Sequence, residues 1–169
     1  MKTDIPQTVY LKDYTPPAFL VDTVDLDFVI ETGSTTVTAT LAVRRNPAVA
    51  AQPLVLDGDE LETLSVAVDG EKWPFSETPT QLTLSDLPGA FTLTTEVRIQ
   101  PDSNTRLSGL YRSKDGYFTQ CEAQGFRRIT WFLDRPDVMS TYTVTLHADK
   151  EKLPVLLANG NPVAAGDEA

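Results

Sequence analysis

The sequence contains only one cysteine and one histidine, Cys121 and His147, in 169 residues. Zinc sites in proteins are normally built from several cysteine or histidine ligands, so no self-contained zinc site is expected in this chain. A single cysteine cannot form an internal disulfide, which is typical of a reducing compartment and predicts a cytoplasmic location. His147 falls on the polar side of a predicted strand, so we interpret it as an exposed residue rather than a catalytic base.

Other functional signatures are missing from the sequence as well. It has no glycine-rich phosphate-binding loop and no nucleophile-elbow motif. Its start, "MKTDIPQTVYLKD", lacks the apolar segment of a secretory signal, and no run approaches the roughly 20 apolar residues that cross a bilayer. The formal net charge is −10, with 14 Lys and Arg against 24 Asp and Glu. Because nucleic acids and acidic membranes bind positively charged surfaces, neither is expected as a partner.

Alternation of apolar and polar residues is the commonest pattern in the chain. Within residues 19–30, and again from Val37 to Val43, apolar residues recur at every second position. Such alternation indicates β-strands with one buried face, here joined as a hairpin around Gly33.

Further strands and turns are predicted downstream. Asp69-Gly70 and Asp115-Gly116 each lie in extended segments and predict hairpin turns, because Asp and Gly tolerate positive φ. The remaining predicted strands lie in "LVLDG", "LSVAVDGEKW", "QLTLSDLP", "FTLTTEVRI", "GLYRSKDGYFTQ", "STYTVTLHAD" and "LPVLLANG".

These patterns predict an all-β domain that spans residues 1–169. No long amphipathic helix is visible, and only residues 125–132, "GFRRITWF", have room for a short helical turn. We expect about eight to ten strands in packed sheets, as a sandwich or saddle-like arrangement. No internal repeat or linker divides the chain. It stops after a turn-like "NGNP" without a closing element, which predicts that it is one part of a larger protein.

Residues 119–138, "TQCEAQGFRRITWFLDRPDV", differ from this strand pattern. Most of their side chains have an ordinary structural explanation. Cys121 is expected to be a small buried side chain, because no activating partner is visible near it. Pro136 is expected to end any helical turn. The remaining expectations are surface ion pairs of Arg127 and Arg128 with Asp134 or Asp137, and core or interface positions for Trp131 and Phe132.

Gln120 and Glu122 are the candidate binding residues of this segment. Positions i and i+2 of an extended chain point to the same side, with Cys121 facing the other way. A carboxylate beside an amide suits a cationic amine that carries several N–H donors. From the pattern alone, ordinary solvated polar side chains remain the favoured interpretation.

Several segments resemble a known family. The most specific are "TQCEAQGFRRITWFLDRPDV" and the following "TYTVTLHADKEKLPVLLANGNPV". Supporting segments are "DYTPPAFLVDTVDLDF", "LVLDGDELETLSVAVDGE", "LSDLPGAFTLTTEVRIQP" and "NTRLSGLYRS". In this order, and over nearly the whole chain, they resemble the N-terminal β domain of zinc-dependent aminopeptidases of the aminopeptidase N (alanyl aminopeptidase) type, in its bacterial branch.

The resemblance implies a saddle-shaped set of β-sheets that covers a catalytic domain located C-terminal to this chain. It implies that the zinc lies in that domain, on a His-Glu-x-x-His helix with a further Glu ligand. Neither this motif nor the Gly-x-Met-Glu-Asn loop of the family occurs here. By position, the resemblance implies that Glu122 binds the free α-amino group of the substrate and that Gln120 lines the pocket for the first side chain.

The predicted function is therefore that of a substrate-rim domain in an enzyme that removes N-terminal amino acids from peptides. The resemblance implies zinc in the full-length protein, with the catalytic domain of the same polypeptide and peptide N-termini as partners. The chain alone is expected to be inactive. Two alternatives remain open: a stand-alone β-sandwich module that binds sugars or protein surfaces, and a related protein with altered chemistry. A reading frame that continues into a His-Glu-x-x-His segment would exclude the stand-alone module.

Overall fold

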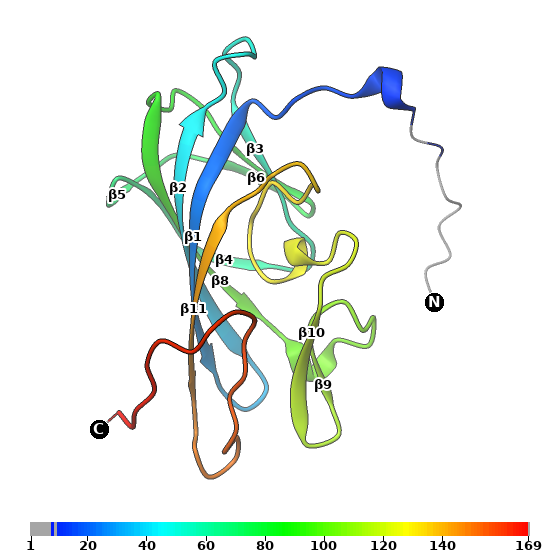
Figure 1. Ribbon diagram of the computed structural model, residues 1–169, viewed down its shortest axis with the longest axis vertical. Coiled ribbons are helices and arrows are strands. Elements are labelled where there is room, and N and C mark those ends of the chain that lie inside the picture. The colour runs from blue at the N-terminus through cyan, green and yellow to red at the C-terminus, as the bar shows by residue number, and fades with distance from the viewer. Residues whose placement is uncertain (1–7, 9, 169) are drawn as a thin grey trace.

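The computed structural model describes residues 8 and 10–168 and contains, within them, eleven β-strands and three short 3₁₀ turns (Figure 1). The start of the chain, where no secretory signal is predicted, lies largely outside this range. The turns are η1 (Leu11–Asp13), η2 (Pro101–Ser103) and η3 (Phe126–Arg128). The all-β prediction is confirmed, and η3 falls in the segment for which a helical turn was expected. The other turns, η1 and η2, were not predicted.

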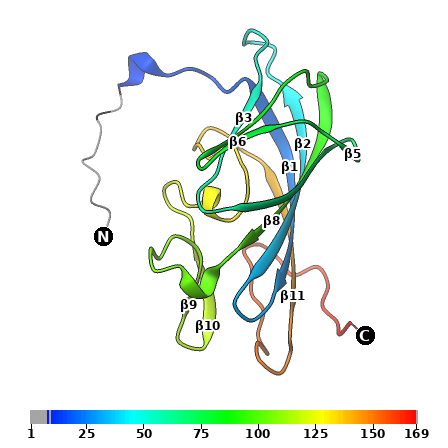
Figure 2. The ribbon, with the colours of Figure 1, turned by 180° about the vertical axis from the view of Figure 1, so that it is seen from behind.

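Six strands form one large sheet, in the order β11-β1-β2-β8-β4-β5. Strand β11 pairs parallel to β1, and the other neighbours are antiparallel. Figures 1 and 2 show β11 at the edge of this sheet beside β1. The members are β1 (Phe19–Ile30), β2 (Thr35–Arg45), β4 (Glu62–Val68), β5 (Glu71–Lys72), β8 (Ala90–Ile99) and β11 (Thr141–Ala148).

The remaining strands form two small sheets. One contains β3 (Leu54–Asp57), β7 (Gln81–Leu84) and β6 (Ser76–Thr78), and the other is a two-stranded ribbon of β9 (Gly109–Ser113) and β10 (Gly116–Gln120). Both views show the ribbon standing apart from the large sheet (Figures 1 and 2). The eleven strands exceed the predicted eight to ten, and β6, with three residues, is too short to produce a periodic pattern.

The core follows the predicted alternation. Buried side chains occupy every second position of β2 from Thr35 to Val43, and they continue on β1 and β8. Trp131 and Phe132 join the same core cluster, 1% and 3% exposed. Backbone hydrogen bonds between Phe132 and Asp57 attach this segment to β3. Both aromatic residues are therefore core anchors of this domain, one of the two positions predicted for them.

The hairpin turns follow the sequence closely, with one shift. Asp69 and Gly70 adopt φ of 52° and 84°, as the predicted β4–β5 turn requires. In the β9–β10 ribbon, Gly116 pairs with Ser113, so the turn is formed by residues 114–115. It lies one residue earlier than predicted, and Lys114 rather than Gly116 takes the positive φ of 55°.

The last predicted strand, "LPVLLANG", is absent: residues 149–168 contain no strand. Its apolar side chains find no buried face, and Leu157 is among the large hydrophobic residues that remain exposed. Pro154 also lacks the N–H that a sheet ladder uses. Ion pairs of Lys150 with Asp167 and of His147 with Glu168 hold this C-terminal segment instead.

Candidate functional site

Gln120 is the last residue of β10 and pairs with Gly109 at the open end of the ribbon. Its side chain and that of Glu122 are exposed, whereas Cys121 between them is partly buried. The extended geometry predicted for this whole segment is wrong beyond Gln120, since residues 122–125 form a turn. The direction of the Glu122 side chain is therefore determined by this turn and not by strand alternation.

This turn is tightly packed against the end of β10. The N–H of Gly125 donates a hydrogen bond of 2.7 Å to the carbonyl oxygen of Cys121. A Cβ on Gly125 would lie 2.7 Å from the carbonyl oxygen of Gln120 and 2.8 Å from the Cα of Cys121, closer than real contacts allow. Only glycine therefore fits here without displacing Gln120 and Cys121. The peptide bond between Glu122 and Ala123 is cis.

Cys121 is a structural residue of the site rather than a nucleophile. Burial, reinforced by the negative charge of Asp134, raises the pKa of its thiol to about 11. The reactive thiolate is therefore almost absent at neutral pH. The expected role as a small apolar side chain agrees with its contact with the hydrophobic core.

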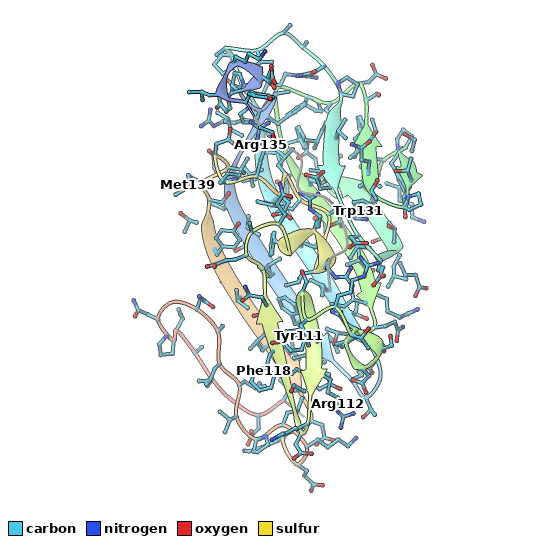
Figure 3. The ribbon with its side chains drawn as sticks, turned by 90° about the vertical axis from the view of Figure 1, so that its right-hand side faces the viewer. Tyr111, Arg112, Phe118, Trp131, Arg135 and Met139 are labelled. Carbon is cyan, nitrogen blue, oxygen red and sulfur yellow. The ribbon has the colours of Figure 1, made fainter. Side chains whose placement is uncertain are left out.

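Aromatic side chains remain exposed on both sides of this segment. Phe118, 53% exposed, stacks against Tyr111 across the ribbon with 6.2 Å between ring centroids (Figure 3). Tyr142, 47% exposed, packs edge-on against Phe126 at 6.0 Å. We call these four residues the aromatic face. Trp131, in contrast, points into the core, 1% exposed.

The arginines are less exposed than predicted, and one has different partners. Arg127 forms the expected pair with Asp134, with Nε 2.8 Å from Oδ2. The pairing predicted for Arg128 is wrong: its guanidinium is buried and reaches Asp59 and Glu60. Consecutive side chains of a 3₁₀ turn point about 120° apart, so the two arginines leave η3 in different directions.

Arg135 and Asp137, on either side of Pro136, bind the N-terminal segment. Asp137 accepts hydrogen bonds from Arg135 Nε at 2.6 Å and from the Tyr14 hydroxyl at 3.0 Å. The hydrogen bond from Arg135 is the main reason that the pKa of Asp137 lies below its ordinary value. Arg135 also donates to the carbonyl oxygen of Thr15 at 2.7 Å. This cluster attaches the chain before β1 to the far end of residues 119–138.

His147 has acidic partners that the sequence pattern did not reveal. Its Nε2 lies 3.1 Å from Asp27 Oδ2, and its Nδ1 lies 3.1 Å from Glu168 Oε2. These hydrogen bonds, first that of Asp27, raise the pKa of His147. His147 was expected to be exposed, and its side chain is 28% exposed, which is less than predicted because of these contacts. Parallel pairing of β11 with β1 places Val29 opposite His147 and brings Asp27 within reach.

The side chains that the structure describes do not assemble a zinc site. Within residues 8 and 10–168, no group of three His, Cys, Asp or Glu side chains is arranged to hold a metal. The described residues also include no helix that is long and apolar enough to span a membrane.

Residues 20–168 match the family model of the Peptidase M1 N-terminal domain. The chain belongs to this family. The M1 N-terminal domain described here is 49% identical to "Aminopeptidase N" of Caulobacter vibrioides, over 98% of this chain and 19% of the relative. It is 45% identical to "Aminopeptidase N" of Escherichia coli, over 98% of this chain and 19% of the relative. The chain therefore spans about a fifth of the length of these relatives.

A solved structure supports the same assignment. Aminopeptidase A of Legionella pneumophila, crystallised in complex with aspartic acid, superposes on this M1 N-terminal domain with a TM-score of 0.83 at 30% sequence identity. The match covers 89% of this chain and 18% of that chain. The predicted membership in the aminopeptidase N type is thereby confirmed by both sequence and fold.

Proposed function

We propose that this M1 N-terminal domain forms the substrate rim of a larger zinc aminopeptidase, which removes N-terminal amino acids from peptides. The observation that carries the proposal is the exposure of Gln120 and Glu122 at a tightly packed turn, in a domain 49% identical to an aminopeptidase N. In this proposal residues 1–169 are a single N-terminal domain that precedes a catalytic domain in the same polypeptide.

Glu122 anchors the free α-ammonium group of the substrate in this proposal. A carboxylate without a partner at a desolvated site is costly, whereas an ammonium group supplies strong charge-assisted hydrogen bonds. Blocked N-termini and internal peptide segments lack that charge and are rejected. Gln120, at the end of β10, offers both a donor and an acceptor to the pocket for the first side chain.

The hydrolytic chemistry belongs to the rest of the protein. A zinc ion there would activate water and polarise the scissile carbonyl group. The one histidine and one cysteine of this chain are too few for such a site, so we propose that residues 1–169 alone are inactive. The proposed location is the cytoplasm, since a sequence with one cysteine cannot form an internal disulfide, as is typical of a reducing compartment.

The aromatic face is the proposed contact with the catalytic domain. Phe118 and Tyr142 are about half exposed beside the proposed substrate residues. Exposed aromatic groups of this kind are typical of surfaces that become buried between domains. The chain covers 19% of the length of its aminopeptidase N relatives, so the rest of such a protein is large enough to cover this face.

Glu122→Gln in the full-length protein tests the proposal. The substitution keeps the shape of the side chain and removes its charge. Because a hydrogen bond to a charged group contributes roughly 1.5–3 kcal/mol, kcat/KM should fall by about ten- to a hundredfold. Zinc content and Tm should stay unchanged, because Glu122 is exposed and is no ligand in this proposal. Retention of wild-type kcat/KM, or a loss explained by lost zinc or unfolding, would contradict the proposed role.

A further inference from the structure

Arg128 has a buried guanidinium group, although it is only a few residues from the exposed Glu122. Its side chain is 6% exposed. Nη1 donates to Asp59 Oδ2 and Nη2 donates to Glu60 Oε2, each at 2.5 Å. Nε donates to the carbonyl oxygen of Ser108 at 3.1 Å. A planar guanidinium group can bind all these acceptors at once, whereas a lysine ammonium group is a single point charge.

The contact with Ser108 connects Arg128 to the proposed substrate residues. Ser108 precedes Gly109, which is the strand partner of Gln120. A Cβ on Gly109, which has φ of 73°, would lie 2.6 Å from the Cβ of Arg128. The main chain at Gly109 therefore lies directly against Arg128. A shift of Arg128 would move the strand partner of Gln120.

A second connection runs through the turn at Gly125. The N–H of Arg128 donates to the carbonyl oxygen of Gly125 at 3.1 Å, and the N–H of Gly125 donates to Cys121. A Cβ on Gly125 would lie 2.9 Å from Ser108 Oγ and 2.7 Å from the carbonyl oxygen of Gln120. Arg128 thus contacts both sides of the chain segment that presents Gln120 and Glu122.

Polar contacts rather than close packing hold the guanidinium group. An open pocket of about 210 Å³ borders Arg128, Asp59 and Glu60, and Ser103 and Asn104 also line it. In a close-packed interior, neighbouring atoms restrict a side chain on all sides, whereas the guanidinium group of Arg128 has free space beside it. A shorter or less branched cation at position 128 would therefore have room to move away from Ser108.

Arg106 provides an internal comparison. It pairs with the same two carboxylates, with Nη1 3.2 Å from Asp59 Oδ2 and Nη2 3.2 Å from Glu60 Oε1. Its side chain is 61% exposed. Among the described residues, its guanidinium group forms no hydrogen bond to Ser108. Arg106 and Arg128 therefore share their acidic partners but differ in contact with the ribbon.

We propose that Arg128 is a positioning residue, which holds the segment 120–122 at the substrate rim through Ser108 and Gly125. This inference rests on the proposed function, because it assumes that the placement of Glu122 matters for substrate binding. Arg128 does not touch substrate. It acts by keeping the end of β10 and the following turn in one place, so that Glu122 is preorganised for an ammonium group.

The test compares Arg128→Lys with the matched control Arg106→Lys in the full-length protein. Both substitutions keep the positive charge beside Asp59 and Glu60, and only the first removes the hydrogen bond to Ser108. Amide hydrogen exchange is measured over residues 119–125 and over the strands of the large sheet. KM and kcat are measured with an unblocked aminoacyl substrate, together with those of Glu122→Gln.

For Arg128→Lys, we expect exchange over residues 119–125 to become about tenfold faster, with the large sheet unchanged. KM should rise by about tenfold while kcat changes by less than about twofold, because an amine anchor binds ground state and transition state alike. Arg106→Lys should change neither quantity. Together these results would support the proposal.

Three outcomes would overturn it. Exchange over residues 119–125 that matches wild type would show that Arg128 does not hold the segment. Faster exchange across the large sheet as well would assign Arg128 a general role in stability. Faster local exchange with normal KM, in a protein where Glu122→Gln is impaired, would exclude a role in substrate binding. If Glu122→Gln is also normal, the proposed function fails, and the exchange data alone decide whether Arg128 positions the segment.

Discussion

The indole N–H of Trp131 donates a hydrogen bond of 2.8 Å to Thr63 Oγ1. Trp131 lies in the segment that carries the candidate site, whereas Thr63 belongs to β4 of the large sheet. The indole ring is 1% exposed, so its N–H has no access to water as an alternative partner. This hydrogen bond therefore attaches the segment 119–138 to the framework of the domain.

Thr63→Val should destabilise the domain by about 1–3 kcal/mol, because it leaves the buried N–H of Trp131 without an acceptor. The valine has nearly the same shape, so packing changes contribute little. Urea unfolding followed by tryptophan fluorescence measures the loss. Thr63→Ser keeps the hydroxyl group and should lose much less. Equal losses for both variants would mean that the hydrogen bond is unimportant.

Gly58→Ala should be strongly destabilising. A Cβ at this position would lie 2.1 Å from Cζ3 of Trp131, so the indole ring or the chain after β3 has to move. Overpacking of this kind costs about 1–3 kcal/mol or more. Gly89→Ala is the matched control, since a Cβ there meets no atom within 4 Å. Thermal unfolding of the two variants should separate them by several degrees. Similar Tm values would contradict the close contact of Gly58 with Trp131.

Gln120→Ala in the full-length protein should change the preference for the first residue of the substrate. The reason is that Gln120 is proposed to line that pocket, whereas Glu122 binds the amine that all substrates share. We expect kcat/KM ratios between aminoacyl substrates to shift by about tenfold, within the range that pocket contacts supply. A uniform loss across substrates would instead favour a role in amine binding or folding.

His147 should make stability depend on pH. Its pKa is raised above the ordinary 6.5 by hydrogen bonds to Asp27 first and Glu168 second. The folded state therefore binds the proton more tightly than the unfolded state. The resulting stabilisation is complete below the unfolded pKa and is lost as the pH rises through the folded pKa. The effect is modest because these side chains are partly solvated.

Measurement of Tm between about pH 5 and about pH 9 tests this dependence. His147→Gln should flatten the profile near neutral pH and lower Tm mainly at the acidic end. Glu168→Gln should remove part of the same effect and leave the Asp27 contact in place. A profile for His147→Gln that parallels wild type at every pH would show that the contacts of His147 with Asp27 and Glu168 do not stabilise the folded state.

The strand content of this domain was readable from the sequence. Alternation in β1, β2 and β8 reports burial of every second side chain, and that property depends on neighbours within a few residues. Asp69-Gly70 likewise identified its turn, because the positive φ values there favour these residue types. The same local signals were silent about β6, which is too short to show a period, and they misplaced a strand at "LPVLLANG".

The residues of the candidate site were also named from the sequence, through their resemblance to the aminopeptidase N type. The local structure around these residues could not be predicted from the sequence. The turn that ends the extended chain at Gln120 depends on Gly125 packing against β10, and no strand pattern contains that contact. The sequence also suggested the wrong acidic partners for Arg128. Asp134 and Asp137 are close to it in the chain, whereas its actual partners, Asp59 and Glu60, are distant.

The sequence by itself determined the class of fold, the period of its strands and the family to which the chain belongs. These depend on residue type and local order, since side chains alternate along any extended chain. Only the tertiary structure decided that Arg128 meets Asp59 and Glu60 and that His147 meets Asp27. Those pairs are 69, 68 and 120 residues apart. The pairing of β11 with β1 brings His147 to Asp27, and backbone hydrogen bonds of Asp59 with Arg127 and of Asp57 with Phe132 bring Arg128 to its partners. No local pattern relates these charges.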